Sequence, residues 1–362
     1  MTPIERRIRE RIARGGPIPV AEYMAIALGD PEHGYYRTRD PLGAGGDFIT
    51  APEISQVFGE LIGLWCVVTW RAMDAPDPVR LIELGPGRGT LMVDALRAAA
   101  GVPEFTAAAA IHLVETSPAL RDRQRDALAA ARPTWHDEMG DIPDGPCLVI
   151  ANEFFDALPV EQFERTPDGW RRRCIGVDDA AGTLCFVLSD GESEPPAPFH
   201  DAPPGVPCEV RPEADRLAGD IARRITRDGG AALIIDYGHA ARAPGETLQA
   251  VRRHRFDDVL ARPGLADLTA HVDFEALSEA ARMAGADVHG PLAQGTFLDR
   301  LGLGARMRRL CDGAPERAED IRSRCRRLSD PAEMGELFKV VAITPPGSAA
   351  PAGFEPEGGS PC

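Results

Sequence analysis

Lysine is almost absent from this sequence: Lys339 is the only one, and all other side-chain positive charge comes from arginine and histidine. Acidic residues outnumber basic ones, and the formal net charge is −16. A chain with this charge has no general electrostatic attraction for nucleic acids or for anionic membranes, so neither is expected as a partner. A basic protein partner is compatible with the acidic balance, although such a balance more commonly serves solubility.

Long hydrophobic runs are also missing. No stretch approaches the roughly 20 apolar residues that a membrane-spanning helix needs, and residues 1–14 lack the apolar core of a secretory signal. None of the eight cysteines forms a C-x-x-C pair and no histidine cluster accompanies them, so a metal site is not expected. Cysteines within apolar runs indicate thiols of a reducing compartment, and we expect a cytoplasmic protein.

The length of 362 residues, with 44% hydrophobic and 27% charged residues, is ordinary for a globular protein with a large core. Helical spacing of apolar residues predicts helices within residues 1–78, followed there by a glycine-rich loop. Residues 79–344 predict an α/β domain with insertions at about 160–207 and 240–330. Residues 345–362 are rich in Pro, Gly and Ser and predict a disordered tail.

The chain is organised around a strand, a turn and a helix near residue 85. Residues 79–84 are a short apolar run that predicts a buried strand, and residues 90–98 predict a helix. Between them lies a turn with three glycines, formed by Gly85, Pro86, Gly87, Arg88 and Gly89. This order is typical of the nucleotide-binding corner of a doubly wound α/β sheet.

The glycine spacing indicates the kind of ligand. The pattern is G-x-G-x-G rather than the G-x-G-x-x-G of dinucleotide sites, which favours a ligand without a pyrophosphate, such as S-adenosyl-L-methionine. Glu115 ends a second apolar run, where an acid can accept both ribose hydroxyls. Asp141, on the loop before the next strand, is a candidate for the adenine edge. A nicotinamide-dependent oxidoreductase, which the spacing disfavours, and a βαβ turn without a ligand are the alternatives.

A second candidate segment follows the predicted strand at residues 147–151. It contains three polar residues and two aromatic ones: Asn152, Glu153, Phe154, Phe155 and Asp156. Open α/β sheets place their chemistry at the carboxyl ends of central strands. Carboxylates beside aromatic rings can hold a nitrogen nucleophile, although the two rings would also serve as core anchors.

Other candidate residues lie at the same predicted sheet edge or in loops near it. Asp236 and His239 follow the predicted strand at residues 231–235 and would lie beside Asn152. Residues 251–273 are too polar for a core and too apolar for a linker, so we expect this segment, with His271, to wall the pocket.

A glycine-rich loop precedes the α/β domain. It carries Asp47, Thr50 and Glu53 and predicts a lid over the site, with an ordered surface Ω-loop as the alternative. Further along the chain, alternating residues 160–190 with two turns predict a β-meander inserted into the α/β fold.

Several motifs occur together in a specific order. They are GDFITAPEISQVFGE at residues 46–60, ELGPGRGT at 83–90, NEFFDALP at 152–159, DYGH at 236–239, DLTAHVDF at 267–274, QGTFL at 294–298 and MGE at 334–336. This set resembles the MidA family, the S-adenosylmethionine-dependent methyltransferases of mitochondrial complex I assembly, which also has bacterial members. The resemblance implies a seven-stranded, Rossmann-like methyltransferase fold and methylation of arginine in a protein. In the mitochondrial members the target is a complex I core subunit.

The resemblance also suggests roles for the candidate residues. Glu153 with Asp156 would grip the planar guanidinium, and either Asp236 or His239 would accept its proton. The glycine turn would line the methionine end of the cofactor, with Asn152 beside it and Glu115 at the ribose. The alternative function is a non-catalytic assembly or binding protein that keeps the fold. The methyl acceptor, the number of methyl groups and the oligomeric state stay open.

Overall fold

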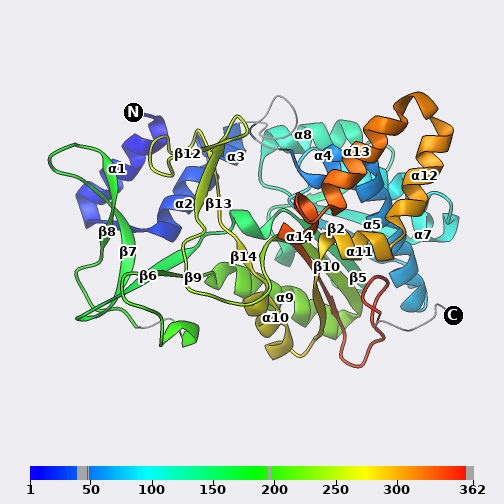
Figure 1. The fold of residues 1–362 in the computed structure, drawn as a ribbon. Helices are drawn as coiled ribbons and strands as arrows, with labels where there is room; N and C mark the ends of the chain where they lie inside the picture. Colours follow the sequence, from blue (N-terminus) through cyan, green and yellow to red (C-terminus); the bar gives the residue numbers. More distant parts are fainter. Residues whose placement is uncertain (39–46, 48, 195–196, 356–362) are drawn as a thin grey trace. The chain divides into compact units, whose positions relative to one another are not determined.

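A computed structural model describes residues 1–38, 47, 49–194 and 197–355 and divides the chain into two compact units (Figure 1). The first, which we call the insertion unit, contains Met1–Phe48, Asp156–Arg216 and Ala241–His271. The second, the sheet unit, contains Ile49–Phe155, Leu217–Ala240 and Val272–Cys362. No helix in the described part of the chain is long and apolar enough to cross a membrane.

The sheet unit is built on a mixed sheet whose strands follow the order β15-β16-β10-β5-β2-β3-β4, with the short β14 pairing beside the end of β10. The strands are β2 (Val79–Leu84), β3 (Ala109–Val114), β4 (Thr134–His136), β5 (Cys147–Asn152), β10 (Gly230–His239), β14 (Val272–Asp273), β15 (Asp287–Ala293) and β16 (Phe338–Thr344). Pairing from β10 to β4 is parallel, whereas β16 is antiparallel to both neighbours. The predicted seven-stranded doubly wound sheet is confirmed.

Strand order reverses between β2 and β5, so the carboxyl ends of these two strands form the switch point where open α/β sheets bind ligands. The helices of the unit are α4 (Ala51–Ile54), α5 (Gln56–Ala72), α6 (Thr90–Ala99), α7 (Pro103–Ala108), α8 (Pro118–Ala127), the greater part of α9 (Pro212–Asp228), α10 (Phe274–Met283), α11 (Gln294–Arg300), α12 (Leu303–Gly313), α13 (Ala318–Ser329) and α14 (Met334–Leu337). Three 3₁₀ turns are η1 (Met139–Asp141), η2 (Phe155–Ala157), which crosses into the insertion unit, and η4 (Pro315–Arg317).

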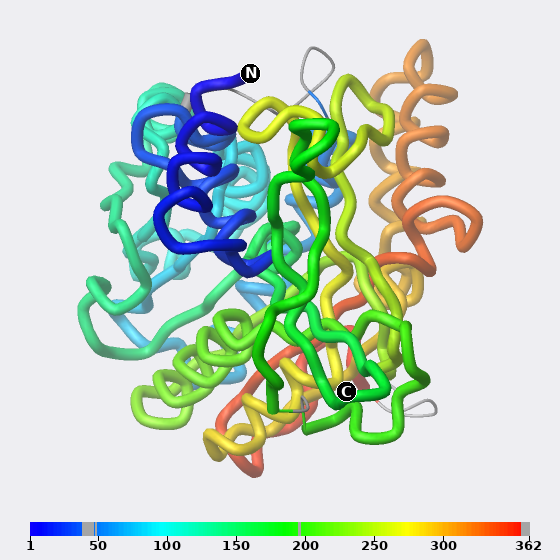
Figure 2. The backbone as a smooth tube through the Cα atoms, turned by 90° about the vertical axis from the view of Figure 1, so that its left-hand side faces the viewer, coloured from blue at the N-terminus to red at the C-terminus, as the bar shows by residue number. Residues whose placement is uncertain are grey.

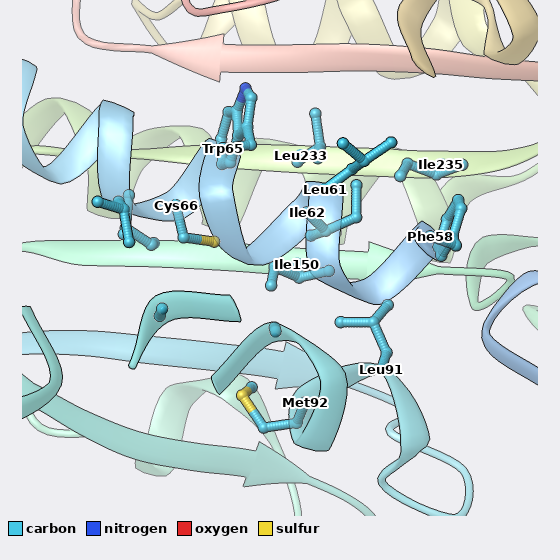
Figure 3. Close-up of a cluster of buried hydrophobic side chains, with 14 of the residues drawn as sticks. Phe58, Leu61, Ile62, Trp65, Cys66, Leu91, Met92, Ile150, Leu233 and Ile235 are labelled. Carbon is cyan, nitrogen blue, oxygen red and sulfur yellow. The ribbon is translucent and has the colours of Figure 1, made fainter. Parts of the chain in front are cut away.

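The core of the sheet unit lies between α5 and the central strands (Figure 3). Phe58, Leu61 and Trp65 on α5 are buried against this face of the sheet, to which Ile150 and Leu233 contribute. Because side chains alternate along a strand, the neighbouring residues of β5 and β10 point to the opposite face, and they are buried as well. The central strands are thus covered on both faces, as expected for parallel strands.

The insertion unit combines N-terminal helices with two small sheets, and Figure 2 shows its blue helices and green strands. One sheet has the order β1-β7-β6-β9 with β8 pairing β7, and the other has the order β12-β11-β13. Its elements are α1 (Pro3–Gly15), β1 (Ile18–Pro19), α2 (Val20–Gly29), α3 (Tyr35–Thr38), β6 (Glu161–Thr166), β7 (Gly169–Val177), β8 (Leu184–Leu188), η3 (Ala197–Phe199), β9 (Pro207–Val210), β11 (Gln249–Arg252), β12 (Arg255–Asp257) and β13 (Asp267–Thr269). The predicted meander is present as β6, β7 and β8.

The structure differs from the sequence-based boundaries in three places. The division falls after Phe48 rather than at residue 78, because α4 and α5 pack on the sheet unit. Residues 249–269 form a three-stranded sheet that the sequence did not predict. The tail predicted to be disordered is packed as far as residue 355, since Phe354 is buried with its ring centroid 5.2 Å from that of Phe297. The glycines predicted to form a lid at residues 43–46 lie outside the described residues.

Candidate functional site

The glycine turn after β2 brings bare backbone to the switch point of the sheet. Gly85, Gly87 and Gly89 have φ values of +60°, +54° and +81°, which side chains other than glycine rarely adopt. A Cβ atom on Gly85 would lie 2.7 Å from Cδ2 of Phe154. The turn therefore lies against the segment after β5, and the two sequence-predicted motifs are brought together.

Glu115 lies beside the same turn. Its Oε1 accepts a hydrogen bond from the backbone N–H of Ser117 at 2.7 Å, and its Oε2 accepts one from Nε2 of Gln124 at 3.3 Å. The same Nε2 donates to the carbonyl of Gly87 at 2.7 Å. A single buried amide thus ties the predicted ribose acid to the predicted methionine-binding turn. No local sequence pattern indicates this role for Gln124, which lies among charged residues of α8.

Glu83 is a second residue that the predictions missed as a site residue. It is only 3% exposed, and its Oε2 has no hydrogen-bond partner among the residues that the structure describes. Burial raises the pKa of this carboxyl to about 8. A buried carboxylate oxygen without a partner, two positions before Gly85, suits a cationic group of a ligand such as an α-amino group. The available signal was its position directly before the glycine motif.

The raised pKa of Glu83 leads to a pH-dependent prediction. The folded protein binds this proton more tightly than the unfolded chain, whose pKa is near 4.5. The proton on Glu83 therefore contributes fully to the free energy of unfolding below about pH 4.5, and this contribution is lost as the pH rises to about 8. In Glu83→Gln this loss should disappear. Denaturant titrations without cofactor at pH 5 and pH 8 should show wild-type stability falling relative to the variant by roughly 4 kcal/mol; parallel pH curves would contradict the assignment.

Glu153 directly follows β5 in a strained backbone conformation, with a φ of +50°. Its Oε1 accepts hydrogen bonds from the backbone N–H of Ala51 at 2.7 Å and from Nδ2 of Asn152 at 3.2 Å. Oδ1 of Asn152 is buried and has no hydrogen-bond partner in the described part of the chain. The left-handed backbone and the open amide oxygen thus occur together at the strand end where the sequence predicts a site.

Helix α4 connects the two motifs. Thr50 occupies its N-cap position without a side-chain cap hydrogen bond, and the backbone N–H of Ala51 in its first turn donates to Glu153. At its other side, Oε1 of Glu53 accepts a hydrogen bond from the hydroxyl of Thr90 at 2.5 Å, and its Oε2 lies 3.6 Å from Nη1 of Arg88. Glu53, predicted to bind substrate, is thus engaged with the glycine turn and the start of α6.

The structure buries two of the predicted site residues, Asp236 and Phe155. Asp236 is fully buried; its Oδ2 accepts the backbone N–H groups of Phe154 and Phe155 at 3.1 and 2.9 Å, and its Oδ1 accepts that of Tyr237 at 2.9 Å. These three hydrogen bonds fix the loop after β5, and the proton-acceptor role predicted for Asp236 stays a prediction. Phe155 is fully buried, whereas Phe154 is partly exposed. The predicted contacts of both rings with a substrate stay predictions.

His239 and Asp141 also lie in the sheet unit. His239 is the last residue of β10 and is partly buried, in register with Asp273 of β14. Asp141 ends η1, in the loop between β4 and β5, and is exposed. Both lie in loops or strand ends on the carboxyl side of the sheet, as the sequence predicted; their proposed contacts with ligand stay predictions.

Three predicted site residues belong to the insertion unit. Asp47 is buried, where its Oδ2 accepts the hydroxyl of Tyr35 at 2.8 Å and its Oδ1 accepts the N–H of Arg253 at 2.8 Å, so it fastens a hairpin. Asp156 is buried and its carbonyl accepts the N–H of Ala270. The N–H of His271 donates to Oγ1 of Thr247 at 2.9 Å. The ligand contacts predicted for these three residues stay predictions.

Comparison with known proteins agrees with this geometry. A family model described as an S-adenosyl-L-methionine-dependent methyltransferase matches residues 61–292. Protein arginine methyltransferase NDUFAF7 of Mus musculus and its homologue in Drosophila melanogaster, both mitochondrial, are 39% and 41% identical, over 95% and 94% of this chain and 85% of each relative. A Burkholderia thailandensis structure with bound S-adenosyl-homocysteine has a TM-score of 0.85 at 31% identity, covering 97% of this chain and 94% of that one.

These relatives also correct one expectation. The sequence predicted a cytoplasmic protein from its reduced cysteines and from the lack of a secretory signal, but the relatives named above are mitochondrial. Reduced thiols are compatible with both the cytoplasm and the mitochondrion, so cysteine usage cannot distinguish between these two compartments. On its identity to these relatives and the match to the family model, the chain belongs to this family of S-adenosyl-L-methionine-dependent methyltransferases.

Proposed function

We propose that this chain transfers a methyl group from S-adenosyl-L-methionine to an arginine guanidinium of a protein. The observation that carries the proposal is the position of Glu153, a strained carboxylate at the end of β5 across the switch point from the glycine turn. The relatives named as protein arginine methyltransferases support the choice of acceptor.

The chain's own residues can hold the cofactor at the switch point. When bound, S-adenosyl-L-methionine supplies a methyl group on a positively charged sulfur. The backbone of the glycine turn would lie against its methionine end, with the open oxygen of Glu83 near the amino group. Glu115, fixed by Gln124, would accept the ribose hydroxyls, and Asp141 would meet the adenine edge. Oδ1 of Asn152 is a further acceptor at the strand end.

Carboxylates solve two problems of arginine chemistry. A guanidinium nitrogen is a poor nucleophile because its lone pair is delocalised over the planar group, and the group stays charged at any ordinary pH. Glu153 would grip the planar fork and draw positive charge away from the attacking nitrogen. The exposed face of Phe154 would contact the same plane. Positioning and charge placement of this kind supply most of the rate in group transfer.

The attacking nitrogen gains a carbon and must lose a proton, which needs an acceptor. Asp236 is engaged by three backbone amides, so His239 is the residue that we propose for this role. A histidine changes charge near neutral pH and is the most frequent general base.

The proposed target is a subunit of respiratory complex I, which rests on the family resemblance alone. The test is to incubate the purified chain with methyl-labelled S-adenosyl-L-methionine and a mitochondrial or bacterial lysate, followed by hydrolysis and amino-acid analysis. Label in methylated arginine of a complex I subunit is expected. Label in another side chain or in a small molecule would reject the arginine acceptor. Cofactor binding by calorimetry without any labelled product would favour a non-catalytic assembly protein.

A further inference from the structure

The β11–β12 hairpin of the insertion unit carries a basic and aromatic tip. Arg253 and His254 form its two-residue turn with φ values of +52° and +60°, and Arg255 and Phe256 follow in β12. All four are exposed, and Phe256 is 80% exposed. These positions combine two arginines and a histidine with an exposed phenylalanine, on a chain whose net charge is −16. We call these four residues the hairpin tip.

Asp47 anchors the backbone of the hairpin tip. Oδ1 of Asp47 accepts the backbone N–H of Arg253 at 2.8 Å, and its carbonyl accepts that of His254 at 3.0 Å. The hydroxyl of Tyr35 in turn donates to Asp47 at 2.8 Å. Backbone at the turn is therefore fixed before any partner arrives, which lowers the entropy cost of binding.

The charges of the tip are not neutralised within the hairpin. Asp257, the acid that follows, pairs with Arg252 at 3.1 Å and with Arg262 at 3.3 Å. Within residues 1–38, 47, 49–194 and 197–355, no acidic side chain forms an ion pair with Arg253 or Arg255. The two guanidinium groups thus remain available to an external carboxylate.

We propose that the hairpin tip is a docking surface for an acidic segment of the protein substrate, an inference that rests on the proposed function. Guanidinium groups bind carboxylates bidentately, and an exposed aromatic ring on a rigid support is a typical binding hot spot. The net negative charge of the chain disfavours RNA or an anionic membrane as the partner, because an extended polyanion would also be repelled by the acidic residues outside the tip. A short acidic segment can contact the tip alone and avoid the acidic residues elsewhere on the chain.

Binding of defined peptides tests the proposal without requiring turnover. The probes are a fluorescein-labelled peptide with one arginine flanked by glutamates and the same peptide with glutamines, measured by anisotropy with S-adenosyl-homocysteine present. We expect the glutamate peptide to bind about tenfold more tightly, with an affinity that falls as salt rises. Arg253→Glu with Arg255→Glu should remove this preference. Phe256→Ser, which changes no charge, should weaken binding of both peptides about threefold to tenfold.

Matched variants on the sheet unit provide the controls. Arg308→Glu with Arg309→Glu on α12 makes the same change of charge at exposed positions, and Met283→Ser removes a side chain that is 88% exposed. Both should leave peptide affinity within about twofold of wild type. Equal losses of peptide affinity in the tip and α12 variants would overturn the proposal, as would equal affinity of the wild type for the glutamate and glutamine peptides. Tighter tip-dependent binding of phosphatidylserine vesicles or RNA would also overturn it. If the wild-type chain binds the glutamate peptide through the tip but transfers no methyl group, the result would count against the proposed function alone.

Discussion

Glu153→Gln should lower the turnover of methyl transfer by about 10² to 10³-fold while S-adenosyl-L-methionine still binds, since removing one well-placed group that stabilises transition-state charge has an effect of this size. Glutamine keeps the shape of the side chain and can still accept the hydrogen bond from Ala51 N–H. It cannot carry the negative charge that would draw positive charge away from the attacking nitrogen. Turnover with labelled cofactor and affinity by calorimetry would be measured on the same preparation.

The matched control for this experiment is Glu104→Gln, which removes one carboxylate from an exposed position on α7. It should change neither turnover nor cofactor affinity by more than about twofold. Unchanged turnover in Glu153→Gln would remove Glu153 from the mechanism. A joint loss of turnover and cofactor affinity would instead show that the carboxylate mainly supports α4 and the glycine turn.

Gly85→Ala should weaken S-adenosyl-L-methionine binding by roughly 100-fold. The left-handed backbone costs about 1–2 kcal/mol once a Cβ is present, and the new atom would approach Cδ2 of Phe154 to 2.7 Å. Relief of that contact must move the turn or the ring, and both line the proposed site; overpacking of this kind costs typically 1–3 kcal/mol. The free variant can relieve these costs, about 3 kcal/mol together, by relaxing the turn. The cofactor must then restore the strained conformation, which lowers its affinity by about two orders of magnitude.

Gly101→Ala is the control for the second experiment. No heavy atom lies within 4 Å of a Cβ added there, and its φ is not in the left-handed region. Calorimetry should therefore give a wild-type affinity for this variant, with thermal stability unchanged or slightly raised. If Gly85→Ala also binds the cofactor normally, the glycine turn does not hold the methionine end and the assignment of this corner is wrong.

Much of the sheet unit could be predicted because its signals are local. The run before Gly85, the glycine turn itself and the apolar strands ending at Asn152 and Asp236 each follow from composition and period alone. That the first two motifs meet followed from one rule, namely that parallel strands place their carboxyl ends at one edge. The contact expected for a Cβ on Gly85 with Phe154 is the observation that bears this out.

The contacts that sequence reasoning missed are tertiary ones. Gln124 looks like any polar residue on a helix, and only the structure shows its amide between Glu115 and Gly87. Asp236 looked like a free acid at a strand end, but the loop amides that engage it come from a segment about 80 residues earlier in the chain. Such pairings have no period or motif, so no local pattern can reveal them.

The short helix α4 has a consequence for the order of events. It is four residues long, yet it is fastened at one point to the strand end proposed to hold the acceptor and at another to the bend proposed to hold the donor. A helix of one turn has little internal freedom to bend when one of its ends moves. Any adjustment of the bend when the donor arrives is therefore transmitted to the carboxylate of Glu153, so donor occupancy and readiness for the acceptor are mechanically linked.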